Sequence, residues 1–316
     1  MTEPARREAI QAARTGAARA VEAYVRDRLF PALGRATTPF RVDVPGEGLR
    51  SLVFFVIPKS GPSLVVRCVP SRDDASWLAA AVDLFQQHRL PSAHAIYRDL
   101  SLWTRWRRGW RVFVEELVDG TALGGETDPA ALASVGETYA RVHAVDREGW
   151  DRPHRPRSDD MIEQWTSWAE KVARRVGSAA LDPLAREFEK AALELRARRP
   201  VALRRYALCH NRVTPDNVIV RAGGPACLID LERVKFGSHL QELAKIRNGV
   251  LSGDETRFAA LLAGYLRAAP KESHPEADPR AWAWHLALAD FERAHGALRE
   301  GRRDDALRIL AKKIGG

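Results

Sequence analysis

The hydrophobic pattern of the chain changes once, near residue 127. Before that point the runs FRVDVPGEG, SLVFFVIP and SLVVRCVP are short and rich in valine and phenylalanine, and Pro45-Gly46 and 59-KSGP-62 separate them, as turns separate β-strands. After it, apolar residues recur every three or four positions, which is the period of an amphipathic helix. The pattern predicts an α+β protein of two lobes, a β-rich N-lobe followed by a helical C-lobe.

The same patterns predict the individual elements and their grouping. We expect an N-terminal helix within 1–34, an N-lobe of β-sheet plus one helix over 35–120, and a helical C-lobe over 121–316. The polar, proline-rich segment 150–160 is expected to be an exposed connector. Helices are predicted over 5–30, 73–88, 130–146, 159–175, 182–198, 240–252, 254–268 and 279–312, and further strands over 94–99, 101–106 and 110–118.

The composition is that of a globular protein of ordinary size. The chain has 316 residues, of which 45% are hydrophobic and 29% charged, and it contains no apolar run long enough to span a membrane. Its first residues carry charge throughout and lack an apolar signal region, so a cytoplasmic location is expected. Cys68, Cys209 and Cys227 show no paired spacing and lie in apolar runs, which predicts buried thiols.

The net charge of +9 favours an acidic partner, such as a nucleotide, a nucleic acid or an anionic substrate. The 50 basic residues are interspersed with 41 acidic ones rather than gathered in one patch. Nucleic-acid binding usually requires a concentrated basic surface, so the sequence does not favour it. The expected partners are a nucleotide and a small-molecule or peptide acceptor, with a protein partner as a further option.

One polar loop interrupts the helical half, in 208-LCHNRVTPDNVIV-220 followed by 228-LIDLERV-234. Asn217 precedes a β-branched run, and Asp230 ends a short apolar one. An amide and a carboxylate are oxygen ligands suited to a magnesium ion that bridges phosphates. Taken singly, Asn217 could instead stabilise a turn and Asp230 could cap a helix; His210, seven residues before Asn217, makes the metal site the better interpretation.

The N-lobe offers candidate phosphate contacts. Gly46 and Gly48 lie between two predicted strands, where a backbone without side chains can approach phosphate oxygens, although an ordinary hairpin turn explains them equally well. Arg67 stands in the middle of SLVVRCVP. Considered alone, this arginine is expected to face solvent from an edge strand; the alternative places it in a cleft.

These motifs together resemble the aminoglycoside phosphotransferase and choline kinase family, relatives of the protein kinases, over about residues 35 to 270. That family has a loop H-G-D-x-x-x-x-N and a strand I-D-W/F-E, and this chain has His210-Asn211-Arg212-Val213-Thr214-Pro215-Asp216-Asn217 and Ile229-Asp230-Leu231-Glu232. The segments 136-GETYARVHAVD-146 and 237-GSHLQELA-244 are similar to two further family motifs, L-x-x-L-H-x-x-D and G-D-x-x-x-D-L-A.

The resemblance implies a kinase-like fold with ATP and Mg²⁺ as cofactors, both weak or absent if the site has degraded. It places His210 and Arg212 in the catalytic loop and makes Asn217 and Asp230 the metal ligands. It also implies that Arg67 is the cation for the ATP phosphates. The segment 113-FVEELVDGTAL-123 is similar to the family's hinge, which implies an adenine site near Glu115 to Val118 that includes Glu116 and Leu117.

The departures from the family are as informative as the matches. Arg212 stands where the family has its aspartate base, and a guanidinium stays protonated and has no lone pair to accept a proton. The helix glutamate that usually pairs with the strand cation is also not evident, and Asp73, Asp74 or Asp83 would have to replace it.

Three interpretations of Arg212 remain open. The protein is a pseudokinase that binds nucleotide but transfers nothing, or it catalyses slowly with Asp216 or the substrate's own group as the base. In the third, Arg212 replaces part of the magnesium charge and grips phosphate. The leading hypothesis is a pseudokinase or atypical phosphotransferase that binds ATP and magnesium and acts on, or scaffolds, a peptide or small metabolite. The alternatives are an active ATP-dependent kinase of a small-molecule or peptide hydroxyl, and a non-catalytic interaction subunit of a biosynthetic complex.

Three further segments bear on surface and core. The hairpin 102-LWTRWRRGWRVF-113 is either a binding surface or an amphipathic hairpin with its apolar side in the core, and the core is favoured. His143 is expected to form structural hydrogen bonds in the helical half, and 281–291 is expected to be a core helix.

Overall fold

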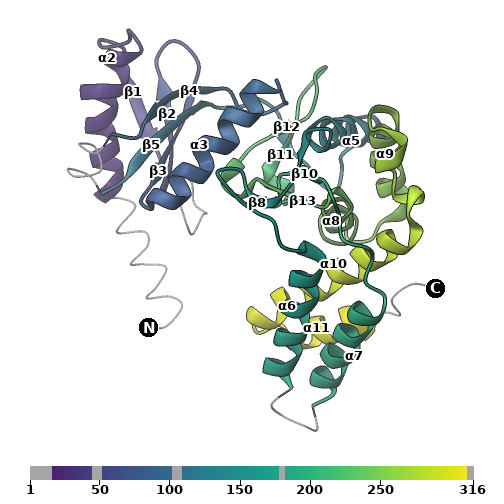
Figure 1. The fold of residues 1–316 in the computed structure, drawn as a ribbon. Coiled ribbons are helices and arrows are strands. Elements are labelled where there is room, and N and C mark those ends of the chain that lie inside the picture. The colour runs from purple at the N-terminus through teal and green to yellow at the C-terminus, as the bar shows by residue number, and fades with distance from the viewer. Residues whose placement is uncertain (1–15, 45–51, 102–108, 178–181, 312–316) are drawn as a thin grey trace. The chain divides into compact units, whose positions relative to one another are not determined.

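The computed structural model describes residues 16–44, 52–101, 109–177 and 182–311 (Figure 1). The chain forms two compact units, one of residues 1–83 and 92–119 and the other of residues 84–91 and 120–316. The first contains an antiparallel sheet and the second is mainly helical, which confirms the predicted two-lobed, kinase-like α+β fold.

The first unit is built on a five-stranded antiparallel sheet in the order β1-β2-β3-β5-β4. A helical segment that includes η1 (Val25–Leu29) and α2 (Phe30–Ala32) shares a buried core with it through Tyr24, Phe30, Phe54 and Val112. The strands are β1 (Phe40–Asp43), β2 (Leu52–Pro58), β3 (Leu64–Val69), β4 (Ala95–Asp99) and β5 (Arg111–Glu116), and the helix between β3 and β4 is α3 (Arg72–Gln87).

The second unit combines helices with two small antiparallel sheets, ordered β7-β10-β13-β8-β9 and β12-β11-β6. Its strands are β6 (Thr121–Ala122), β7 (Asp146–Arg147), β8 (Trp150–Arg152), β9 (Arg155–Arg157), β10 (Tyr206–Cys209), β11 (Val218–Val220), β12 (Cys227–Leu228) and β13 (Lys235–Gly237). Its α-helices are α5 (Pro129–His143), α6 (Met161–Val176), α7 (Pro183–Ala197), α8 (His239–Lys245), α9 (Glu255–Ala268), α10 (Pro279–Arg299) and α11 (Arg303–Ala311). The π-turn η4 (Ile246–Val250) follows α8, and short 3₁₀ turns form at η2 (Pro215–Asn217), η3 (Leu231–Arg233), η5 (Lys271–Ser273) and η6 (Pro275–Ala277).

Aspartates fix where the main helices of this unit begin. The side chain of the residue before each of five helices accepts a backbone N–H from the first turn, and such a cap satisfies a donor that has no partner within the helix. The capping residues are Asp128, Asp160, Asp182, Asp254 and Asp278. A proline follows in α5, α7 and α10, where its missing N–H costs nothing.

Most of the predicted elements are confirmed; one helix prediction was wrong, and one predicted connector contains a hairpin that was not predicted. The helix predicted over 279–312 is divided into α10 and α11, because Gly301 adopts a positive φ of 77° that ends α10. The connector predicted over 150–160 contains the hairpin β8–β9, which Trp150 anchors by burying its ring and donating from Nε1 to the carbonyl of Asp159 at 2.8 Å. The predicted strand 101–106 lies almost wholly outside the described residues.

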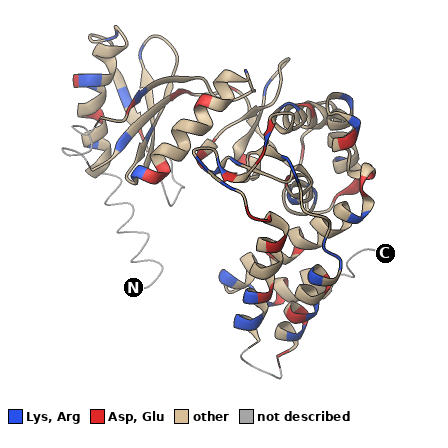
Figure 2. Cartoon of the chain, in the orientation of Figure 1, with Lys and Arg blue, Asp and Glu red and all other residues tan. Residues whose placement is uncertain are grey.

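The structure also bears on the predicted cysteines, the core helix, the hairpin 102–113 and the distribution of charge. The three cysteines are buried, as predicted, and α10 contributes Trp284, Leu288 and Phe291 to the core. In the hairpin 102–113, Trp103 and Trp106 lie outside the described residues, while Trp110 is buried among core residues. Within the described part of the chain, no helix combines the length and hydropathy needed to cross a membrane. Basic and acidic residues are interspersed over the helices of each unit (Figure 2).

Helices α5 and α9 approach each other closely because each carries a glycine at the contact. A Cβ atom on Gly136 would overlap the carbonyl oxygen of Leu261, and one on Gly264 would overlap that of Ala133. Since α5 also ends at His143, this close approach helps to position that side chain.

We predict that Gly136→Ala lowers the free energy of unfolding by at least about 2 kcal/mol, because the methyl group forces two helix backbones apart. The matched control is Gly296→Ala in α10, where an added Cβ meets no atom within 4 Å. The control should leave stability unchanged or raise it by about 0.5–1 kcal/mol. Denaturant unfolding measures both, and equal stability of the two variants would contradict the packing account.

Candidate functional site

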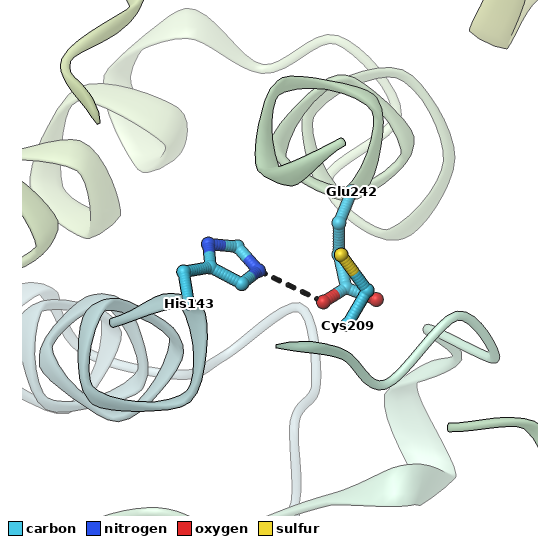
Figure 3. Close-up of side chains that lie close together, drawn as sticks. All are labelled: His143, Cys209 and Glu242. Carbon is cyan, nitrogen blue, oxygen red and sulfur yellow. Dashed lines mark hydrogen bonds and ion pairs between the residues drawn. The ribbon is translucent and has the colours of Figure 1, made fainter. Parts of the chain in front are cut away.

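The buried carboxylate of Glu242 on α8 accepts hydrogen bonds from the backbone of the loop after β10. Its Oε2 accepts the backbone N–H of His210 at 3.0 Å, and its Oε1 accepts that of Asn211. His143, at the end of α5, places its Nε2 2.9 Å from the same Oε2 (Figure 3), and its Nδ1 lies 3.1 Å from the hydroxyl of Tyr265 on α9. The structural role predicted for His143 is therefore confirmed.

The charge state of Glu242 follows from these contacts. Burial by itself raises the pKa of the Glu242 carboxyl, but His143 and the backbone N–H of Asn211 stabilise the carboxylate and hold the pKa below its ordinary value. A charged, hydrogen-bonded carboxylate beneath the loop fixes the backbone of His210 and Asn211, and Asn211 adopts a φ of 61° there. The position of the loop therefore depends on one buried side chain.

His143, Cys209 and Glu242 also present three potential metal-ligand atoms within 4.8 Å of one another (Figure 3). The thiol of Cys209 is buried, and burial followed by the charge of Glu242 raises its pKa well above the usual value, which keeps it protonated. Both carboxylate oxygens of Glu242 already accept hydrogen bonds. The cluster is therefore better described as a hydrogen-bonded core than as a metal centre.

Arg212 and Asp230 form an ion pair at the surface of this loop. The guanidinium Nη1 lies 2.6 Å from Oδ2 of Asp230, and the side chains are 42% and 13% exposed. Asp230 has a left-handed backbone with φ 62°, a conformation that aspartate tolerates better than most residues. The guanidinium of Arg212, at the position of the family's aspartate base, is therefore paired with Asp230, the predicted metal ligand.

Asn217 lies next to this pair and is mostly buried. Its side-chain Nδ2 donates to the backbone carbonyl of Arg212 at 2.9 Å, and its backbone carbonyl accepts the N–H of Ile229 at 3.0 Å. The structure thus brings Arg212, Asn217 and Asp230 together, as the resemblance implied. Their role as nucleotide or metal ligands stays a prediction.

The donor set does not fit a magnesium ion as it is arranged. Arg212 Nη1 donates to Oδ2 of Asp230, so the guanidinium places a positive charge next to the carboxylate that a metal would bind. Asn217 offers an amide oxygen, but one neutral oxygen alone is a weak site for Mg²⁺. A divalent ion bound by Asp230 would therefore lie beside the guanidinium charge of Arg212.

His210 is fully buried rather than facing the loop surface. Its Nε2 lies 2.7 Å from the carbonyl of Ile229, the residue before Asp230. This contact joins the loop to the strand end, so the geometry favours a positioning role for His210 over a direct part in catalysis.

The candidate nucleotide-binding residues lie in the first unit. Arg67 is 7% exposed on β3, the central strand of its sheet, so the expectation of a solvent-facing arginine on an edge strand was wrong. Gly46 and Gly48 lie outside the described residues. The N–H groups of Glu116 and Leu117 donate to the carbonyls of His94 and Ser63 at 3.0 and 2.9 Å, so these two donors are already used within the unit. Asp83 pairs with Arg98 at 2.6 Å.

The antiparallel sheet unit, the helical unit and the loop between β10 and β11 define the class of kinase-like phosphotransferase folds. The sequence matches the phosphotransferase enzyme family (APH) over residues 42–285, and the chain belongs to that family. No curated protein matches it at a significant level.

Solved structures agree with this fold. A thermostable mutant of the aminoglycoside phosphotransferase APH(4)-Ia is 18% identical, with 90% of this chain and 96% of that chain covered and a TM-score of 0.59. The macrolide 2'-phosphotransferase MphH from Brachybacterium faecium is 16% identical, with 91% and 98% covered and a TM-score of 0.55. An ethanolamine kinase of Plasmodium vivax is 12% identical, with 92% and 85% covered and a TM-score of 0.59. At these identities the likeness concerns the fold.

One important site residue was not singled out from the sequence. Glu242 lies in 237-GSHLQELA-244, a segment that was matched to a family motif only as a whole. Its match to the second acidic position of the motif G-D-x-x-x-D-L-A, directly before Leu243 and Ala244, was the available signal. The ion pair between Arg212 and Asp230 was also not foreseen, although both residues had been identified.

The lowered pKa values of two buried histidines near the site make the stability of the protein depend on pH. Burial, followed by His143, lowers the pKa of His239 to about 3, and burial, followed by His239 and Lys245, lowers that of His285 to about 3. A lowered folded-state pKa means that the unfolded chain binds more protons below its ordinary value, about 6.5, so stability falls as the pH drops from there.

We predict that the free energy of unfolding decreases between about pH 6.5 and pH 5, with each buried histidine contributing about 1.4 kcal/mol per pH unit at most. Denaturant unfolding at several pH values measures the slope, and His285→Gln should reduce it. A slope that is flat in this interval, or that His285→Gln leaves unchanged, would contradict the account.

Proposed function

We propose that the chain is a pseudokinase or atypical phosphotransferase that binds ATP in the family's nucleotide site and uses Arg212 in place of a catalytic base. The observation that carries this proposal is the 2.6 Å contact between Arg212 Nη1 and Asp230 Oδ2. An arginine cannot accept the proton of an acceptor hydroxyl, so ordinary base-assisted transfer is lost.

The retained residues support a nucleotide site rather than an abandoned one. Asn217 and Asp230 are both present, and Arg212 is 42% exposed with only part of its donor set directed at Asp230. A guanidinium has five N–H donors in a planar fork that matches phosphate oxygens. In this proposal Arg212 contacts the nucleotide phosphates and supplies charge that magnesium supplies in other members, which makes the metal conditional.

The acceptor side of the proposal rests on the relatives. Solved relatives include an aminoglycoside phosphotransferase with ADP and hygromycin B, and a spectinomycin phosphotransferase with ADP and spectinomycin. By analogy, this chain would act on or scaffold a small metabolite or a peptide in the cytoplasm. A protein partner in a biosynthetic complex is the remaining alternative.

We predict that Arg212→Asp creates a magnesium site that the natural chain lacks. Two adjacent carboxylates repel each other, so without metal the variant should melt lower by about 2–8 °C, equivalent to about 1–2 kcal/mol. Mg²⁺ should restore its melting temperature and should leave that of the natural chain unchanged. Thermal unfolding with and without Mg²⁺ measures both.

The matched control for this experiment is Arg221→Asp, the same charge change at an exposed residue directly after β11 of the same unit. It should melt identically with and without Mg²⁺. If Mg²⁺ stabilises the natural chain as strongly as Arg212→Asp, the ion pair does not block the metal and the proposal fails.

An active kinase is the competing function, and Asp216 is the observation that favours it. This carboxylate is exposed on the turn η2, one residue before Asn217, and is a possible substitute base. We predict that the natural chain and the Asp216→Asn variant hydrolyse ATP at equal rates. A rate that falls at least about tenfold in Asp216→Asn would identify a working, non-standard base and overturn the pseudokinase proposal.

A further inference from the structure

Helices α7 and α10 of the helical unit lie next to each other and enclose a cavity of about 350 Å³ (Figure 1). This volume is at the lower end of the range of about 300–1,000 Å³ that is usual for small-molecule sites, so the cavity suits a small ligand. It is lined by Glu194, Leu195 and Arg198 at the end of α7 and by Arg280, Ala283, Trp284 and Ala287 at the start of α10. None of these residues belongs to the loop that contains Arg212, so the cavity is a further candidate site of the unit.

Two alanines of α10 create the hollow. Ala283 and Ala287 are four residues apart and therefore lie on the same face of the helix, where neither side chain extends beyond Cβ. Between the two helices, the buried side chains of Trp284 and Leu195 form the floor. The floor is thus an apolar surface that includes an aromatic ring.

Trp284 is held in one orientation by three contacts. Its Nε1 donates to the carbonyl of Leu195 at 2.8 Å, in the last turn of α7, where a carbonyl has no partner within the helix. Its ring stacks on Trp165 of α6 with ring centres 6.3 Å apart, and it meets the ring of His285 edge-on at 5.0 Å. Because these contacts fix the floor before a ligand arrives, little conformational freedom is lost on binding.

Three charged side chains surround this floor, and none of them makes an ion pair within the residues that the structure describes. Glu194 and Arg198 are four residues apart on α7, a spacing at which opposite charges commonly pair, but no ion pair joins them. Arg280 is exposed on α10, and Asp278, two residues before it, accepts the N–H of Ala281 as the cap of that helix. The cavity therefore offers two guanidinium groups and one carboxylate to a ligand.

We propose that this cavity binds a free α-amino acid with an apolar side chain. Arg198 and Arg280 bind the carboxylate of the ligand, Glu194 binds its ammonium group, and its side chain covers the Trp284 ring. A zwitterion supplies a partner for all three charges. A simple carboxylic acid leaves Glu194 without a partner, and a simple amine leaves both guanidinium groups without one, so the site discriminates against both.

Calorimetric titration of the full-length chain, without nucleotide or magnesium, tests this site with three probes that share a phenyl ring and differ in charge. L-Phenylalanine carries both charged groups, 3-phenylpropionate lacks the ammonium group, and 2-phenylethylamine lacks the carboxylate. L-Phenylalanine should bind with a dissociation constant of about 1 mM or lower. Each of the other two probes should bind at least about fivefold more weakly, because one or more charges of the site stay unpaired.

Variants assign the charged groups of the probe to individual side chains. Glu194→Gln should weaken the binding of L-phenylalanine at least about threefold and should not weaken that of 3-phenylpropionate. Arg280→Gln should weaken the binding of both. Ala283→Leu fills the hollow from an exposed position and should abolish the binding of L-phenylalanine. The matched controls, Glu187→Gln on α7 and Arg299→Gln on α10, lie outside the cavity and should bind as the natural chain does.

Each variant is first shown to unfold cooperatively at a melting temperature near that of the natural chain. The two charge variants change residues that are not buried, so they decide the question even if Ala283→Leu does not fold. The inference is overturned if L-phenylalanine does not bind at about 10 mM, if 3-phenylpropionate binds as tightly, or if Glu194→Gln keeps full affinity. Since no probe requires nucleotide, the result is independent of the proposed function.

Discussion

The contact on which the rest of the candidate site depends is the buried carboxylate of Glu242. It accepts the N–H groups of His210 and Asn211 and meets the imidazole of His143, so α8, the loop and α5 are joined at one side chain. A buried charge is costly to leave unpaired, and here each oxygen has a donor. Because these contacts fix the backbone of His210 and Asn211, they also fix the backbone position of Arg212, the next residue.

At the surface of the loop, Arg212 and Asp230 form an internal ion pair. In the family pattern a carboxylate follows His210 by two residues, and it and Asp230 would both attract a cation. Here Arg212 neutralises Asp230 directly at 2.6 Å. The chain therefore carries a positive charge where the family pattern has a negative one, and a guanidinium cannot act as a general base. A phosphotransferase fold does not by itself imply phosphoryl transfer.

The sequence predicted the local features well and the long-range ones poorly. The helical period around Leu132, Val135 and Tyr139 was sufficient for α5, and the spacing of His210, Asn217 and Asp230 located the loop, because both depend on neighbouring residues. The expectation that Arg67, considered alone, faces solvent from an edge strand was wrong because β3 pairs with β5, a segment more than forty residues away, which makes β3 a central strand. The hairpin β8–β9 was missed because its strands are short and polar, and β13 completes the sheet beside it.

The central claim is that Arg212 takes the place of a magnesium ion at the nucleotide phosphates. The most direct test is the affinity of the natural chain for ATP, measured by calorimetry once with excess EDTA and once with saturating Mg²⁺. The account predicts that the two dissociation constants agree within about threefold, a difference below 1 kcal/mol. An affinity at least about tenfold weaker in EDTA would contradict it, since the metal rather than Arg212 would then hold the phosphates.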